Sequence, residues 1–199
     1  MKSITKIIPV IILSFVLSSC SAHDYRETYF IHVVGFETTD NEFSVHAVCE
    51  KLDKKDNGYF LVTRKGNSIK EATKKLMNDY RDCYFATAEI YVIPENHEKP
   101  LLTKLASEIC DSNIYPTKSH IVRAKGSMKS LLDKIKSEKD LKVINRFSEK
   151  NKTNAVKFFS YYMSQKSTEP LLLYINENKE IAVYEDKNQE QQHKDDDKK

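Results

Sequence analysis

Cys20 is the residue whose type and position point most directly to chemistry. Lys2 and Lys6 give the chain a cationic start, and a mostly apolar run follows over residues 7–17. This run is too short to span a bilayer, which needs about 20 apolar residues. It has the length and the flanks of a secretory signal. We therefore interpret residues 1–19 as a signal peptide and Cys20 as the first residue of the mature chain.

The sequence Leu17-Ser18-Ser19-Cys20 resembles the lipobox of bacterial lipoproteins, in which the Cys thiol receives a diacylglyceryl group. Small side chains at Ser18 and Ser19 let an extended chain enter the peptidase, and a Cys thiol is strongly nucleophilic. An ordinary signal peptide with a chance Cys is the alternative. Two acyl chains hold a protein stably on a membrane, whereas one holds it only reversibly. The pattern predicts lipid attachment at Cys20 and a membrane-anchored chain on the outer face of the bacterial cytoplasmic membrane.

Asp24, Arg26 and Glu27 lie in the short polar segment, residues 20–27, that would tether the domain to the lipid. One interpretation is a solvated linker, whose surface ion pairs contribute only about 0–1 kcal/mol each. The other is a docking segment, in which the Arg26 guanidinium binds a partner carboxylate through two parallel hydrogen bonds. These residues by themselves leave both interpretations open.

Enzyme chemistry has little support in the remaining sequence. The six histidines are dispersed, without HExxH or a comparable metal-ligand spacing. The chain also lacks a P-loop, a dinucleotide fingerprint and a Gly-x-Ser-x-Gly motif. We therefore expect no catalytic residues, no metal and no cofactor beyond the lipid on Cys20.

One pair of side chains could still carry thiol or metal chemistry. A two-residue turn at Asp40-Asn41 would place Phe36 opposite Val45, Val34 opposite Ala47 and His32 opposite Cys49. The last pair could supply two ligands of a metal site, or a thiolate and an imidazole. A core histidine beside a buried thiol is the simpler interpretation.

Charge and cysteine content restrict the function further. The chain carries a net charge of +3, of which Lys2 and Lys6 supply two. A mature chain so close to neutral is not that of a nucleic-acid-binding domain, so no nucleic-acid partner is expected.

Three cysteines remain after Cys20, namely Cys49, Cys83 and Cys110. They could form one disulfide and one free thiol, or three unpaired thiols, and the sequence does not choose.

The apolar periodicity predicts a single α+β domain over residues 28–184, a mixed β-sheet with amphipathic helices packed on it. Strands are predicted at 28–38, 43–50, 59–63, 83–93, 120–124, 171–175 and 180–184. Helices are predicted at 69–80, capped by Asn67 or Ser68, at 101–109, after Gly126-Ser127 with apolar residues to Ile135, and around 155–162. Residues 185–199 form a charged tail that we expect to be disordered.

Short patterns along the chain occur in an order that is typical of one family. They are Cys20 followed by Asp24-Tyr25-Arg26-Glu27 and Val33-Val34-Gly35-Phe36, Gly66-Asn67-Ser68-Ile69-Lys70-Glu71-Ala72, Ala88-Glu89-Ile90-Tyr91-Val92-Ile93, and Ile121-Val122-Arg123-Ala124-Lys125-Gly126-Ser127. In this order they resemble the N-terminal domain of the Ger(x)C-type spore germination lipoproteins. The chain departs from that family at Ser21-Ala22-His23, where an aromatic residue usually follows the Cys, and full members are roughly twice as long.

The resemblance implies a lipid-anchored, non-enzymatic subunit of a nutrient germinant receptor. In that family the subunit acts in the spore inner membrane beside two polytopic membrane subunits, and we expect it to work by assembly with them. Contact by Asp24, Arg26 and Glu27 with the domain's sheet edge or with a membrane partner is then favoured. A stand-alone cell-envelope lipoprotein that binds a ligand or a partner protein is the alternative. A thiol or metal enzyme using Cys49 and His32 is a third hypothesis.

Overall fold

The computed structural model describes residues 28–39, 41–51, 58–80, 83–96, 99–151, 154–164, 171–175 and 181–184. The predicted signal peptide and Cys20 lie outside the described residues. The same holds for Asp24, Arg26 and Glu27, and for the tail at 185–199.

Within the described residues, eight strands form one mixed sheet in the order β3-β2-β1-β5-β6-β7-β8, and β4 also pairs with β1. The strands are β1 (Tyr29–Thr39), β2 (Glu42–Lys51), β3 (Gly58–Gly66), β4 (Cys83–Tyr84), β5 (Ile90–Pro94), β6 (His120–Ala124), β7 (Leu171–Ile175) and β8 (Ile181–Tyr184). β1, β2 and β3 are antiparallel neighbours, as are β7 and β8, whereas β4, β5, β6 and β7 join the sheet by parallel pairing. Hairpins at both ends of the sheet therefore flank a parallel centre.

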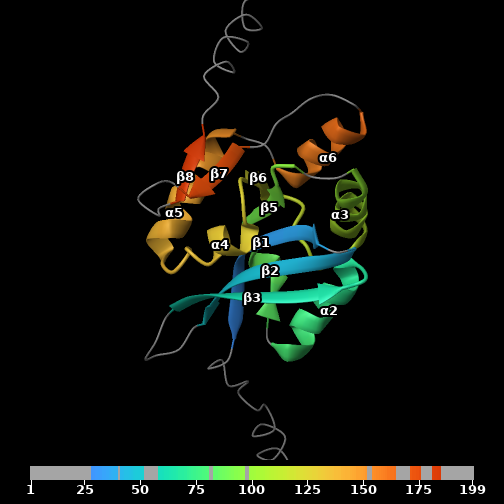
Figure 1. The fold of residues 1–199 in the computed structure, drawn as a ribbon, viewed down its shortest axis with the longest axis horizontal. Coiled ribbons are helices and arrows are strands. Elements are labelled where there is room, and N and C mark those ends of the chain that lie inside the picture. Colours follow the sequence, from blue (N-terminus) through green and yellow to red (C-terminus); the bar gives the residue numbers. More distant parts are fainter. Residues whose placement is uncertain are drawn as a thin grey trace, which may run out of the picture.

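Helices cover both faces of the sheet (Figure 1). They are α2 (Ile69–Asp79), α3 (Lys99–Asp111), α4 (Met128–Leu132), α5 (Glu138–Asn151) and α6 (Ala155–Met163). Buried residues of α2, α3 and α6 share one core cluster with one face of the hairpin, and those of α4 and α5 share a second cluster with the other face. The predicted fold class, a mixed sheet with amphipathic helices in a single α+β domain, is confirmed.

Local sequence explains where α2 begins. The Ser68 side chain accepts a hydrogen bond from the backbone N–H of Glu71, and the Glu71 carboxylate accepts one from the backbone N–H of Asn67. This reciprocal capping satisfies two backbone donors at the start of the helix. Ile69, Ala72 and Leu76 then fall on the buried side, so the predicted stripe faces the sheet.

The sequence prediction omitted α5. The helix is mostly polar, and among its described side chains the buried apolar ones are Leu141 and Ile144. Its start nevertheless has a sequence signal, because Glu138 and Asp140 lie in the first turn, where the helix dipole favours negative charge.

The hairpin register confirms most of the predicted pairing but not its end. Phe36 lies opposite Val45 and Val34 opposite Ala47, as expected, and Asn41 has a φ of 65°. The prediction that His32 faces Cys49 is wrong. The register shifts between Ile31 and Val33, so Ile31 lies opposite Cys49. His32 is the extra residue of a bulge, which turns its side chain to the other face of the sheet.

The predicted continuous strand at 83–93 is also wrong. β4 ends at Tyr84, a 3₁₀ turn, η3 (Phe85–Thr87), follows, and β5 starts at Ile90. The Thr87 hydroxyl donates to the carbonyl of Ile31 at 2.9 Å, and the Glu89 N–H donates to the carbonyl of His32 at 2.9 Å. The break between β4 and β5 thus supplies hydrogen bonds to the bulge in β1.

The three cysteines of the described residues are free thiols. Cys49 on β2 and Cys83 on β4 are buried in one core cluster, whereas Cys110 is exposed. β1 lies between β2 and β4, so the backbones of β2 and β4 are about 9–10 Å apart. A disulfide requires roughly 4.4–6.8 Å between Cα atoms, so Cys49 and Cys83 are too far apart to form one. A hydrogen bond with the Cys83 thiol, together with burial, raises the pKa of the Cys49 thiol. Cys49 is therefore an unreactive core thiol, and Cys83 is buried in the same core cluster.

Gly35 on β1 lies where α4 crosses the sheet. A Cβ atom at this position would lie 2.5 Å from Sδ of Met128 and 2.7 Å from Cδ1 of Leu132. Only glycine lets α4 pack this closely on β1.

We expect Gly35→Ala to lower the free energy of unfolding by about 1–3 kcal/mol, because the added methyl group overpacks the contact with α4. Gly58→Ala is the matched control, since a Cβ atom there meets nothing within 4 Å. Urea unfolding of both variants measures the difference, and equal effects would mean that α4 does not press on Gly35.

The buried stripes of α2 and α4 provide a second test of the fold. Leu76 and Leu132 are 0% and 1% exposed, so Leu76→Asp and Leu132→Asp should each cost several kcal/mol, because an unpaired carboxylate is buried. Lys74 is exposed on α2, and Lys74→Asp should be tolerated. Thermal unfolding followed by circular dichroism separates the three variants, and a loss of the native transition in Lys74→Asp would show that the helix faces are misassigned.

Candidate functional site

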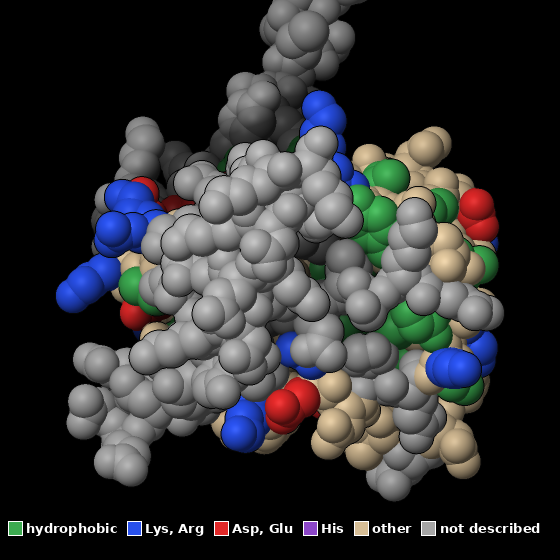
Figure 2. Space-filling model, turned by 90° about the horizontal axis from the view of Figure 1, so that it is seen from above, with side chains coloured by type: hydrophobic (Ala, Val, Ile, Leu, Met, Phe, Trp, Pro, Cys, Tyr) green, Lys and Arg blue, Asp and Glu red, His purple; other side chains and the backbone are tan. Residues whose placement is uncertain are grey.

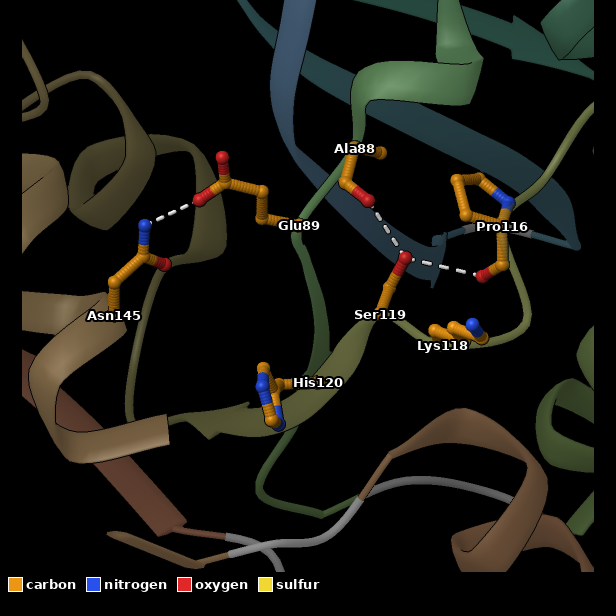
Figure 3. A pocket seen from close by; sticks show the side chains of 7 residues that line it. All are labelled: Ala88, Glu89, Pro116, Lys118, Ser119, His120 and Asn145. Atoms are coloured by element: carbon orange, nitrogen blue, oxygen red, sulfur yellow. Dashed lines mark hydrogen bonds between the residues drawn. The ribbon is translucent and has the colours of Figure 1, made fainter. Parts of the chain in front are cut away.

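Two hollows meet at Glu89, which lies just before β5. The first, the Ser119 hollow, has a volume of about 520 Å³ and is lined by Ala88, Glu89, Pro116, Lys118, Ser119, His120 and Asn145 (Figure 3). The second, the Tyr59 hollow, has a volume of about 620 Å³ and is lined by His32, Glu50, Tyr59, Glu89, Lys136, Ser137, Glu138, Leu141, Lys142 and Asn145. Glu89 and Asn145 belong to both, so the two hollows adjoin.

The bulge in β1 and the start of β6 hold the Glu89 backbone in place. The Glu89 N–H donates to His32, and the Glu89 carbonyl accepts from the N–H of His120 at 2.8 Å. Its side chain is exposed and accepts a hydrogen bond from the Asn145 amide on α5 (Figure 3). The fold thereby presents one carboxylate at the boundary of the two hollows.

Ser119 has a structural role in its hollow. It is 3% exposed, and its hydroxyl lies 2.7 Å from the carbonyl oxygen of Ala88 and 3.0 Å from that of Pro116. These contacts close the loop before β6 onto the segment before β5. The His120 ring points to a different side of the chain (Figure 3), and its Nδ1 atom is buried without a hydrogen-bond partner among the described residues. Ser119 and His120 therefore do not form a nucleophile and base.

The Tyr59 hollow concentrates negative charge around one phenol. Burial raises the pKa of Tyr59 to about 12, and the carboxylates of Glu50, Glu138 and Glu89 add to this effect. Glu50 lies 2.8 Å from Nε2 of His32. The three carboxylates thus face one hydroxyl group from three different parts of the chain.

Two lysines add positive charge to the lining of the same hollow. Lys142 lies 2.8 Å from Glu138, one turn away on α5, and Lys136 lies 2.8 Å from Asp133. The Glu89 carboxylate instead has the neutral Asn145 amide as its hydrogen-bond donor. Such a lining can bind a group that carries both charges, or the charged side chains of a partner.

A separate polar cluster joins the first three strands. Nε2 of His46 lies 2.8 Å from the Glu37 carboxylate, and its Nδ1 lies 2.8 Å from the Thr63 hydroxyl. His46 is opposite Gly35 and Thr63 in the sheet, and Glu37 is its diagonal neighbour. Because a carboxylate can only accept, Nε2 of His46 carries the proton toward Glu37. Hydroxyl, imidazole and carboxylate are thus aligned.

This cluster satisfies buried polar groups. His46 is 2% exposed, and Thr63 lines neither of the two hollows. We therefore interpret the cluster as a link between β1, β2 and β3. Sequence reasoning missed it because Glu37, His46 and Thr63 come together only through the strand register.

Neither hollow was predicted from the sequence, because β-strand breaks and an unpredicted helix form them. The predicted docking residues Asp24, Arg26 and Glu27 and the lipid site Cys20 lie outside the described residues. The pair required by the thiol or metal enzyme hypothesis is not formed, since His32 and Cys49 lie on opposite faces of the sheet.

Among the described residues, no group of three or more His, Cys, Asp or Glu side chains could hold a metal ion. The part of the chain that the structure describes also contains no helix long and apolar enough to cross a membrane.

The His46 cluster makes a prediction about acid stability. The hydrogen bond from His46 lowers the pKa of Glu37 below its ordinary value of 4.5. A carboxylate with a depressed folded pKa stabilises the protein above its unfolded pKa, and this contribution is lost as the pH falls through the folded pKa. Glu37→Gln should therefore destabilise the domain at neutral pH, and its difference from the unmodified chain should shrink in acid.

Urea unfolding across the neutral to acidic range measures that difference. Glu42→Gln, at an exposed position on the same hairpin, is the control and should have little effect at any pH. A Glu37→Gln difference that stays constant in acid would contradict the assignment.

Comparison with known proteins adds no relative to this picture. No protein-family model, no curated protein and no solved structure matches the chain. Function must therefore be inferred from the sequence patterns and from the geometry described above.

Proposed function

We propose that this chain is a lipid-anchored, non-enzymatic accessory subunit of a spore nutrient germinant receptor. Acyl chains on Cys20 hold it on the outer face of the spore inner membrane. It contributes to germination signalling by assembling with two polytopic membrane subunits. The proposal rests on the ordered patterns that resemble the Ger(x)C-type lipoproteins, and its main support is that residues of these patterns depend on one another in the fold.

The first dependence lies within one pattern. A Cβ atom on Gly66 would lie 2.8 Å from the backbone nitrogen of Ala72. Ser68, between them, caps α2. The Gly, the Ser and the Ala of this pattern thus form one compact entry into a helix, which gives their spacing a physical reason.

The second dependence joins two patterns that are far apart in the sequence. Gly35 belongs to the strand pattern near the N-terminus, and it meets Met128 and Leu132 of α4. The later pattern ends at Gly126-Ser127, where Gly126 has a φ of +81° and Ser127 caps α4. A left-handed glycine and a cap set where α4 begins, and the glycine on β1 provides the space for it.

A stand-alone cell-envelope lipoprotein that binds a ligand or a partner protein is the second candidate. The observation that favours it is the Tyr59 hollow, whose lining of both charges is suited to a small zwitterion. The two candidates differ in their partners, since only the receptor subunit requires polytopic membrane proteins.

Capture of the lipidated protein from spore membranes tests the proposal. We expect polytopic receptor subunits to be recovered with the unmodified chain and to be lost with Cys20→Ser, which removes the acyl-accepting thiol. Arg26→Glu should weaken recovery without unfolding the domain, because Arg26 belongs to the predicted polar tether that precedes β1 in the sequence. Lys74→Asp, an exposed charge reversal on α2, is the matched control and should recover as much partner as the unmodified chain.

Deletion of the gene should slow germination with one class of nutrient and leave vegetative growth unchanged. Recovery of no polytopic subunit, together with expression confined to growing cells, would overturn the receptor proposal in favour of the stand-alone lipoprotein.

A further inference from the structure

Aromatic side chains gather at the end of the domain where β1 starts. This aromatic end consists of Tyr29, Phe30, Phe60, Tyr80 and Tyr84. Tyr29 lies 5.7 Å from Phe60 and 5.2 Å from Tyr80 between ring centroids, in edge-to-face contacts. On the other face of the sheet, Phe30 stacks on Tyr84 at 6.0 Å. The rings therefore surround the start of β1 on both faces.

Part of this aromatic end is open to solvent. Tyr84 is 47% exposed, and Met77, on the last turns of α2, is 37% exposed. The four other rings are half-buried. Tyr84 and Met77 lie on opposite faces of the sheet, so they expose apolar surface on both sides of this end and do not form one continuous patch.

The length of chain before β1 indicates what this surface contacts. Only eight positions separate Cys20 from Thr28. Even a fully extended chain of this length spans at most about 26–29 Å. If Cys20 carries the lipid, the start of β1 is the part of the domain held nearest to the bilayer.

We propose that the aromatic end lies in the headgroup region of the membrane that anchors Cys20, with Tyr84 and Met77 in contact with lipid. This inference rests on the proposed lipid anchor. Tyrosine combines an apolar ring with a polar hydroxyl group, and it is enriched at membrane–water interfaces. Shallow burial of Tyr84 and Met77 would fix the orientation of the domain relative to the membrane.

The exposed apolar side chains of α6 lie elsewhere. Val156, Tyr161 and Met163 are 48%, 38% and 67% exposed. Figure 1 places α6 at the end of the molecule opposite the start of β1, and Figure 2, which looks onto that end, shows hydrophobic side chains at its surface. With the short tether, α6 points away from the bilayer and serves as the comparison site.

Tryptophan fluorescence can test the orientation directly, because the chain has no tryptophan. Tyr84→Trp in the full lipidated chain creates a single reporter at the aromatic end, Met77→Trp creates a second, and Tyr161→Trp creates the control on α6. Each protein is bound to vesicles of phosphatidylcholine and phosphatidylglycerol, with or without bromine on the acyl chains. Brominated lipid should reduce the emission of the reporters at 84 and 77 by about twofold, as expected for shallow insertion, and leave the reporter at 161 unchanged.

Vesicle flotation separates failure of this inference from failure of the anchor. A chain that floats with vesicles but shows no quenching at 84 or 77 would overturn the inference while leaving the lipid anchor intact. A chain that does not float would overturn both. Cys20→Ser in the Tyr84→Trp background supplies the unlipidated reference. Blue-shifted emission in this reference before vesicles are added would show that the protein's own chain covers the surface, which also overturns the inference.

Discussion

The bulge in β1 between Ile31 and Val33 is the constraint on which much of the remaining geometry depends. It leaves the carbonyls of Ile31 and His32 in positions where a regular ladder does not use them. Thr87 and Glu89 donate to these two carbonyls. The Thr87 hydroxyl and the Glu89 N–H reach these carbonyls from the segment between β4 and β5, where the strand is interrupted. Because unpaired buried carbonyls are costly, the bulge and the break stabilise each other.

The same bulge determines the polar surface of the domain. It turns His32 out of the core that contains Cys49 and toward Glu50. It also holds the backbone of Glu89, so that the Glu89 carboxylate lies beside α5. A regular strand would instead place His32 opposite the buried Cys49 and would remove His32 from the lining of the Tyr59 hollow. An arrangement suited to thiol or metal chemistry is thus replaced by a charged hollow that can bind a partner.

Burial on both faces makes β1 the centre of the molecule. Ile31, Val34 and Phe36 contribute to the core under α2, α3 and α6, whereas Val33 contributes to the core under α4 and α5. The glycine at position 35 lets α4 approach the sheet closely. If Cys20 carries the proposed lipid, the strand that organises both cores is also the described strand nearest to the anchor in the sequence. In the proposed receptor, β1 would connect the anchored end of the chain to both cores.

The sequence by itself determined the features that depend on neighbouring residues. Helical stripes such as Ile69, Ala72 and Leu76, the Ser68 cap and the two-residue hairpin loop are set by local periodicity and turn chemistry, and the fold class follows from their order. Tertiary structure decided the face of His32, the break after Tyr84 and the position of Glu89, because hydrogen bonds between groups such as Thr87 and Ile31, 56 positions apart, determine them. Tertiary structure likewise decided the His46 cluster and the contact between Gly35 and α4, because their residues are far apart in the sequence. The alternation at 83–93 satisfies a strand pattern equally well with or without the bulge, and only the hydrogen bonds from Thr87 and Glu89 to the carbonyls of Ile31 and His32 distinguish the two.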